Sequence, residues 1–376
     1  MPRGKLHYLH LNGPDVNGSS TEWASSKRGW HVSNPISQAA QLASNSARFG
    51  WYYGINWLMD QQASRLGSRP SYKPTRPVPT KQAMLADLAA VFLADANAVR
   101  DGLYPAVTDE LLSIGDHLSR LRLMMADMPA ALRRRQASDA TSARQLPEAV
   151  GLPDYFTQDF HFQTGGYLSD TSAKIYDVQV ETLFYGSANV MRRSALRPIA
   201  EFIQGQDQRR LSMLDIACGT GRFLRQVRLS FPALKLSGVD LSASYLAEAR
   251  RHLKGLRTVE FIAANAEQLP FENASQDIVS CIFLFHELPA EVRRRVASEI
   301  ARVLKPGGLM VFVDSLQMGD RPGWDGLLEG FPERFHEPYY RQYAIDNLDA
   351  LFTEAGLLPV SSRPVFLSKL MVRRKA

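Results

Sequence analysis

Cysteine is scarce in this sequence, with only two among 376 residues. Cys218 lies in a glycine-rich turn, and Cys281 lies within a run of apolar residues. Their spacing matches neither a zinc site nor a disulfide framework. The sequence therefore predicts a protein of the reducing cytoplasm.

Long apolar runs are missing as well. No stretch reaches the roughly 18 apolar residues that cross a membrane. The opening residues, MPRGKLHYLHLNG, lack the apolar core of a signal peptide. Both absences favour a cytoplasmic protein without a membrane-spanning helix.

Charge of one sign does not dominate the chain. It has 44 Lys and Arg residues against 38 Asp and Glu, which gives a net charge of +6. The basic balance permits an anionic partner but does not require one. A composition of 45% hydrophobic and 22% charged residues is ordinary for a globular protein and excludes wholesale disorder. Two basic runs, LRRR at 132–135 and VRRR at 292–295, are predicted to lie on solvated helix faces.

The length suggests two domains, and the sequence pattern changes near residue 160. Before that point, apolar residues at helical spacing predict helices in 36–66, 81–103 and 108–128. A proline-rich segment separates the first two. No chemical motif occurs in residues 1–160, so we expect a helical domain that acts as a cap or as a dimerisation element. A homodimer is accordingly one expected assembly.

Residues 161–376 alternate strands with helices. Apolar strands are expected at 211–217, 234–241, 258–265, 276–285 and 309–315. Between the last two, 290–304 reads as a helix with Val292, Val296, Ile300 and Val303 on one face. This alternation predicts an α/β fold with an open, doubly wound, Rossmann-like sheet. Ligands of such sheets bind at the carboxyl ends of the strands.

A glycine turn follows the first of these strands, in the stretch MLDIACGTGRF at 213–223. Gly219 and Gly221 let the backbone approach a ligand, but the third glycine of a dinucleotide fingerprint is absent. Asp240 ends the second strand, 19 positions after Gly221, and its carboxylate can accept hydrogen bonds from two ribose hydroxyls. The turn therefore suits a nucleoside without a pyrophosphate. An aminoacyl nucleoside fits, with its amine near Asp215.

Five segments follow one another in the order and spacing of class I S-adenosylmethionine-dependent methyltransferases. LDIACGTGRF resembles the first motif of that family, GVDLSASYL the second, and AANAEQLPF the segment that lines the adenine. QDIVSCIFLFHEL is similar to the fourth motif, and RVLKPGGLMVFVD to the elements that follow it. The resemblance covers 211–372 and is closest to the branch with the ubiquinone and menaquinone C-methyltransferases. It implies S-adenosylmethionine as cofactor, a methyltransferase domain in 161–376 and a small, apolar or aromatic methyl acceptor.

The resemblance also implies which residues bind the cofactor. Gly219 and Gly221 pass against the methionine part, Asp215 orders the turn, and Asp240 holds the ribose. Asn265 stands where the family commonly has aspartate, and its amide oxygen can still accept a hydrogen bond from the adenine amino group. The implied set is completed by neighbours of these motifs and by two tyrosines expected to cover the cofactor: Ala217, Leu241, Ala266, Phe283, Tyr167 and Tyr176.

The methyl acceptor is expected beyond the ends of the fourth and fifth strands. His286 and Asp314 follow those strands, and His336 lies in an aromatic insert at 316–340. We expect these three to face one pocket, which the insert closes over an aromatic small molecule. A histidine there can act as a base near neutral pH. The acidic and histidine residues of the insert match no metal-binding motif, so no metal is predicted.

Other classes of function stay open at this point. A nucleic-acid methyltransferase would suit the basic charge, but the segment after the fourth strand reads FHEL, without the (Asn/Asp)-Pro-Pro-aromatic motif of base amino methylation. Cys281 lies in a strand and not in a nucleophile loop. A non-catalytic protein of the same fold is disfavoured by the intact glycine turn and Asp240. Segment 117–135 mixes Met, Leu and Arg, which also permits a peripheral membrane contact.

Overall fold

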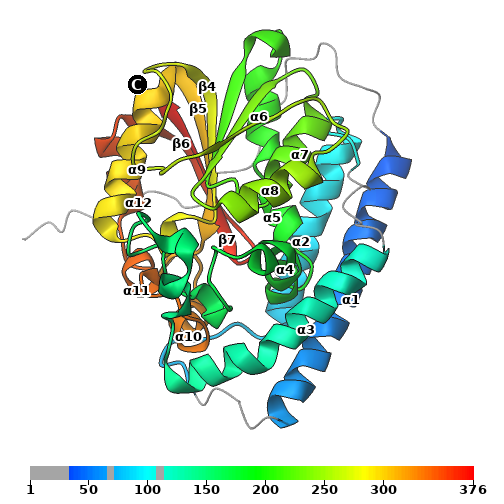
Figure 1. The fold of residues 1–376 in the computed structure, drawn as a ribbon. Helices are drawn as coiled ribbons and strands as arrows, with labels where there is room; N and C mark the ends of the chain where they lie inside the picture. The colour runs from blue at the N-terminus through cyan, green and yellow to red at the C-terminus, as the bar shows by residue number, and fades with distance from the viewer. Residues whose placement is uncertain (1–33, 66–71, 107–113) are drawn as a thin grey trace, which may run out of the picture.

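The fold joins an α/β sheet to a set of N-terminal helices, and Figure 1 shows it as a computed structural model. The structure describes residues 34–65, 72–106 and 114–376. The N-terminal helices are α1 (Pro35–Arg65), α2 (Lys81–Arg100) and α3 (Ile114–Ala137). They correspond to the three helices predicted for this region, but within the described ranges α2 ends three residues before the predicted 103 and α3 continues nine residues beyond the predicted 128.

The sheet has seven strands in the order β3-β2-β1-β4-β5-β7-β6. Strands β1 (Ser212–Ile216), β2 (Lys235–Asp240), β3 (Glu260–Ala263), β4 (Gln276–Ile282) and β5 (Leu304–Ser315) are parallel. Strand β7 (Ser368–Lys375) runs antiparallel between β5 and β6 (Leu357–Val365). The five parallel strands are those predicted, which confirms the doubly wound α/β class. The β6–β7 hairpin was not predicted.

Helices cover both faces of this sheet (Figure 1). Helices α9 (Ala290–Val303) and α12 (Leu348–Glu354) lie on one side, and α6 (Leu196–Ile203), α7 (Arg222–Ser230) and α2 lie on the other. The remaining longer elements are α4 (Asp170–Leu183), α5 (Ala188–Arg193), α8 (Ala243–His252), α10 (Asp325–Arg334) and α11 (Tyr340–Tyr343). Short 3-10 turns occur at Ser142–Gln145, Pro147–Ala149, Phe160–Phe162, Gln208–Arg210 and Phe285–Glu287.

The parallel strands are buried on both faces because successive side chains enter opposite layers. Met213 and Val311 pack in the layer that contains α5, α6 and α7, while their neighbours Leu214 and Phe312 pack against α9 and α12. Such strands read as nearly continuous apolar runs, as they do in this sequence. The predicted apolar face of α9 is likewise buried.

The N-terminal helices share the core of the sheet. Leu88 and Phe92 of α2 belong to the same buried cluster as Met191 of α5 and the strand residues. Asp95 of α2 also forms a buried ion pair of 2.8 Å with Arg193 of α5. By length and composition α2 could cross a membrane, but part of its surface packs in this core. The domain boundary near residue 160 stays a prediction.

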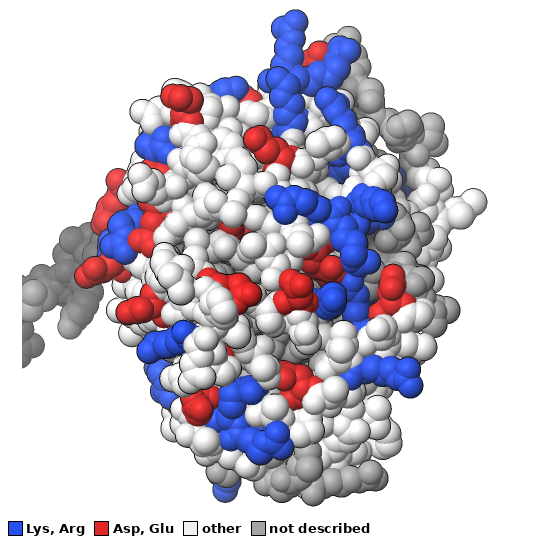
Figure 2. All heavy atoms as spheres, in the orientation of Figure 1, with Lys and Arg blue, Asp and Glu red and all other residues white. Residues whose placement is uncertain are grey.

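Charged side chains of both signs mix over the face shown in Figure 2, with a run of basic ones toward its upper right. One prediction about the basic runs is wrong. Arg293, in the VRRR run, is fully buried, and its guanidinium pairs with Asp346 at 2.8 Å while also donating to the Leu288 carbonyl. Arg134, in the other run, donates to the Phe162 carbonyl at 2.7 Å. These arginines connect elements of the fold.

Candidate cofactor and acceptor site

A pocket opens at the carboxyl ends of the parallel strands, where the fold places ligands. Its empty space, which includes the open mouth, is about 800 Å³. Nine of the eleven cofactor-binding residues predicted from the sequence line it: Ala217, Gly219, Asp240, Leu241, Asn265, Ala266, Phe283, Tyr167 and Tyr176.

The glycine turn after β1 and the end of β2 are tied together by Asp240. The N–H of Gly219 donates to Asp240 Oδ2 at 2.8 Å, and the N–H of Ser242 donates to Oδ1 at 2.9 Å. Gly219 adopts a φ of 53°, a left-handed conformation that favours glycine. Burial raises the pKa of Asp240, although these backbone donors favour its charged form. Each carboxylate oxygen keeps acceptor capacity for a ribose hydroxyl.

Two of the predicted cofactor residues, Asp215 and Gly221, are not in the pocket wall. Asp215 of β1 is buried behind the turn and accepts a hydrogen bond of 2.6 Å from the Ser280 hydroxyl, while burial raises its pKa to about 7. Gly221 begins α7 with a φ of 74°, and a Cβ there would stand 2.9 Å from the Ala249 Cβ. Both support the turn from behind.

At the far end of the pocket, Asn265 is held in place by Glu267. The Asn265 amide nitrogen donates to Glu267 Oε1 at 3.1 Å, and its carbonyl oxygen accepts from the Glu267 N–H at 2.9 Å. The Tyr155 hydroxyl also donates to Glu267 Oε1, at 2.6 Å, so that its ring closes this end. Sequence reasoning missed Tyr155.

An aromatic cover lies over the pocket, with three rings from the segment before the first motif and one ring, that of Tyr245, from α8. The Tyr167 ring stacks on Phe160 with a centroid distance of 5.1 Å and an interplanar angle of 11°. It also meets Tyr176 and Tyr245 edge to face. All four rings line the pocket. The two tyrosines expected to cover the cofactor are therefore placed in its wall, beside two aromatic residues that were not predicted.

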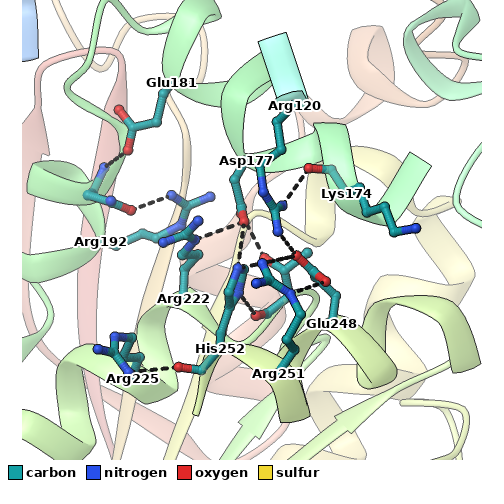
Figure 3. Close-up of polar contacts among 12 residues, drawn as sticks. Arg120, Lys174, Asp177, Glu181, Arg192, Arg222, Arg225, Glu248, Arg251 and His252 are labelled. Carbon is teal, nitrogen blue, oxygen red and sulfur yellow. Dashed lines mark hydrogen bonds and ion pairs between the residues drawn. The ribbon is translucent and has the colours of Figure 1, made fainter. Parts of the chain in front are cut away.

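The glycine turn is held from outside by α4 (Figure 3). Asp177 of α4 accepts hydrogen bonds from the Thr220 hydroxyl at 2.7 Å and from Arg222 Nε at 2.8 Å. His252 Nδ1 donates to the Thr220 carbonyl at 2.7 Å. Close by, Arg120 of α3 pairs with Glu248 of α8. This network connects the N-terminal helices to the backbone of the turn.

His286 and Asp314 lie side by side at the ends of β4 and β5, with His286 Nδ1 2.5 Å from Asp314 Oδ1. Burial acts to lower the pKa of His286, but the charge and hydrogen bond of Asp314 outweigh it and raise the pKa to about 10. The imidazole is therefore a cation near neutral pH. Neither residue is in the pocket wall, but the next residue, Glu287, is.

Glu287 is the acidic side chain on the acceptor side of the pocket. The Tyr167 hydroxyl donates to its Oε1 at 2.6 Å, and His286 Nε2 lies 3.7 Å from the same oxygen. Burial raises the pKa of Glu287 to about 7, against the lowering effect of the His286 charge. The sequence signal for it was only its position at the end of the fourth strand.

His336 does not join the other two predicted catalytic residues. Its Nε2 donates to Gln158 Oε1 at 2.9 Å, and it has no such contact with His286 or Asp314. Residues of the insert at 316–340 are also absent from the pocket wall. Instead, Phe331 and Phe335 pack edge-on against His161, and Tyr340 against His286. The insert thus packs against His161 and His286 and forms no part of the pocket wall.

Comparisons with known proteins find the following similarities. A family described as "Methyltransferase domain" matches residues 213–308. The ubiquinone/menaquinone biosynthesis C-methyltransferase of Campylobacter jejuni is 31% identical over 147 residues, which are 38% of this chain and 59% of that protein. The demethylmenaquinone methyltransferase of Listeria monocytogenes is 32% identical over 170 residues, 40% of this chain and 70% of that protein. The solved structure of an S-adenosylmethionine-dependent methyltransferase from Aquifex aeolicus matches 53% of this chain and 98% of its own, with 17% identity and a TM-score of 0.39.

The chain spans 59%, 42% and 60% of the length of the first three curated relatives. The Listeria protein is covered over more than two thirds of its length. The cofactor of this family is S-adenosylmethionine. The glycine turn allows the close backbone approach that such a nucleoside needs, and Asp240 and Asn265 offer hydrogen-bond acceptors for it. The chain belongs to the class I S-adenosylmethionine-dependent methyltransferases, in the branch of the ubiquinone and menaquinone C-methyltransferases.

Proposed function

We propose that this protein transfers a methyl group from S-adenosylmethionine to a small, mostly apolar or aromatic molecule. The observation that carries the proposal is the pocket itself. Its lining combines Asp240 and the glycine turn with aromatic rings and the carboxylate of Glu287. Its relatives are named for methylation of quinone precursors, which supports an aromatic acceptor.

The residues for the cofactor divide by its three parts. Gly219 would adjoin the methionine part, Asp240 the ribose, and Asn265 and Ala266 the adenine. Tyr167 and Tyr176 would exclude water from above. When bound, S-adenosylmethionine supplies a methyl group on a sulfonium, so that one carbon–sulfur bond is exchanged for a bond to the acceptor as the acceptor gives up a proton.

On the acceptor side, the geometry favours Glu287 as the group that meets the substrate. His286 is already protonated near neutral pH, because Asp314 holds it as a cation. It therefore suits a positioning role, in which its charge stabilises the Glu287 carboxylate 3.7 Å away. His336, bonded to Gln158, has no place in this arrangement. A base role for either histidine is not favoured.

Calorimetry with S-adenosylmethionine and its demethylated product tests the cofactor site. Asp240→Ala should weaken both by about 1.5–3 kcal/mol, the scale of hydrogen bonds to a charged group. Asp207→Ala, an exposed control, should leave both unchanged. Equal affinity in wild type and Asp240→Ala would contradict this assignment.

Methyl transfer is tested by mass spectrometry of a panel of substituted hydroquinones, with RNA as the competing substrate class. A mass gain of one methyl group in a hydroquinone supports the proposal, whereas methylation of RNA alone would overturn it. The homodimer, the peripheral membrane contact and the cytoplasmic location stay predictions from the sequence.

A further inference from the structure

Three residues from distant segments meet behind the aromatic cover. His161 lies in the short turn Phe160–Phe162, Glu287 at the end of Phe285–Glu287, and Glu337 between α10 and α11. One nitrogen or oxygen of each lies within 4.8 Å of the others. His161 Nε2 is 3.0 Å from Glu337 Oε1. The fold thus brings one imidazole and two carboxylates to a single point.

The carboxylate of Glu337 is buried without compensation. Its side chain is 0% exposed, and neither oxygen has a hydrogen-bond partner, since the contact with His161 lacks the alignment of one. Burying a charged or polar group in this way is costly unless a partner offsets it. The group therefore points to a ligand that the protein part alone does not supply.

The neighbouring charges do not provide that partner. Those acting on Glu337 come from Glu287, His286 and Asp314, with no lysine or arginine of the described residues among them. The His286 cation is already engaged by Asp314. The His161 imidazole is close by, with its Nε2 3.0 Å from Glu337 Oε1, and a ring nitrogen of this kind is a common metal ligand. Two carboxyl groups and one imidazole therefore face one another.

We propose that His161, Glu287 and Glu337 bind one divalent transition-metal ion beside the cofactor pocket. Imidazole nitrogen together with carboxylate oxygen is a ligand set that suits zinc and neighbouring first-row ions. Ligand atoms about 2.0–2.2 Å from such an ion lie at most about 4.4 Å apart, so small side-chain movements close the site.

Groups around the three residues have the arrangement that supports metal ligands. Tyr167 donates to Oε1 of the Glu287 carboxylate, and His286 Nε2 lies 3.7 Å from the same oxygen. Such outer partners orient ligating side chains and tune their basicity. Asp314 is not available as a ligand, because its oxygens accept from His286 and from the N–H groups of Phe285 and Ser315.

The position of the ion deepens the proposed function and, in this respect, rests on it. Glu287 belongs both to the pocket wall and to the three ligands. The ion would therefore face the acceptor and bind one of its oxygens. A bound hydroxyl would release its proton to solvent water more readily, which activates a phenol or enol for methylation without a histidine base. The acceptor class indicated is a hydroxylated aromatic or enolic molecule.

The experiment uses the full chain, stripped with a chelator and titrated with Zn²⁺ and Mn²⁺ in the absence of S-adenosylmethionine. We expect one ion per chain, with Zn²⁺ tighter than Mn²⁺. Glu337→Gln and His161→Ala should each lose at least about 100-fold in affinity, more than the roughly 10–100-fold typical of outer partners. Glu333→Gln, on α10 and four residues before Glu337, is the matched control and should bind normally.

Thermal unfolding guards against variants that fold poorly. The chelator should lower the Tm of the wild type and of Glu333→Gln but leave that of Glu337→Gln unchanged, since ligand binding stabilises only a competent site. The inference is overturned if the wild type binds no ion, or if Glu337→Gln and His161→Ala bind as the wild type does. Metal binding without methyl transfer would instead count against the proposed function, and cofactor binding without metal binding would count against the ion alone.

Discussion

The hydroxyl of Tyr167 donates a hydrogen bond of 2.6 Å to Oε1 of Glu287. Tyr167 belongs to the aromatic cover and precedes the first motif, and Glu287 follows the fourth strand. Their bond joins the roof of the cofactor pocket to the acidic group on the acceptor side. The position of the Tyr167 side chain and the position of the Glu287 carboxylate therefore depend on each other.

Tyr167→Phe tests this bond, because it removes the donor and keeps the stacked ring. The buried Glu287 oxygen would lose its partner, so we expect the free energy of unfolding to fall by about 1–3 kcal/mol. Urea denaturation measures the change. Tyr53→Phe is a control at an exposed tyrosine and should stay within about 0.5 kcal/mol of the wild type. A Tyr167→Phe protein as stable as the wild type would show that the bond contributes little.

Gly221→Ala tests the packing behind the glycine turn. The new Cβ would meet the Ala249 Cβ at 2.9 Å and Leu253 Cδ1 at 3.0 Å, at a φ of 74°. We expect a loss of about 2–5 kcal/mol in the free energy of unfolding, the sum of left-handed strain and overpacking. The matched control is Gly255→Ala, which has a φ of 84° and open space around its Cβ, and should cost about 1–2 kcal/mol. Equal losses in the free energy of unfolding, measured by chemical denaturation, would show that Ala249 and Leu253 move aside at no cost.

The part of the fold that sequence reasoning predicted is the part whose signal is local. Strands β1 to β5 are short apolar runs closed by turns, and α9 shows its buried face at helical spacing. The β6–β7 hairpin was missed because β6 is an exposed edge strand that contains Pro359 and Pro364, and its pattern has no alternation. Strand β6 forms because β7 supplies its antiparallel hydrogen-bonding partner.

The site residues likewise fall into those with a local sequence signal and those without one. Asp240 and Gly219 lie in a motif whose spacing carries their role, so they could be placed from the sequence. His161, Glu287 and Glu337 are separated by 126 and 50 residues, and only tertiary packing brings them together. Arg293 was expected in solvent because three arginines in a row are typical of an exposed helix face, whereas Asp346 offers a partly buried partner that no local pattern reveals.

Asp95→Ala tests whether the N-terminal helices and the sheet unfold together. The carboxylate of Asp95 in α2 accepts hydrogen bonds from Gln41 and Asn45 of α1, from Tyr104 in the segment after α2, and from Arg193 of α5. Its removal leaves a buried guanidinium without its carboxylate, so we expect a loss of about 3–5 kcal/mol in a single cooperative transition. Asp101→Ala, at an exposed pair with Arg100, is the control and should change little. Two separate transitions in the wild type would show that the helices form an independent unit.

The last prediction concerns acid stability and Asp177, which holds Thr220 of the glycine turn. Burial acts to raise the pKa of Asp177, but Arg222, His252, Thr220 and Arg192 outweigh it and lower the pKa from 3.8 to about 2. Because the folded-state pKa lies below the unfolded one, the carboxylate stabilises the fold above pH 4, and this contribution is lost as the pH falls toward 2. At about 1.4 kcal/mol for each pKa unit, it amounts to about 2 kcal/mol. The difference in unfolding free energy between the wild type and Asp177→Asn should therefore narrow by about 2 kcal/mol between pH 6 and pH 2. The comparison cancels the titration of other carboxylates, which both proteins share. A difference that stays constant over this range would show that Asp177 has the same pKa in the folded and unfolded chains.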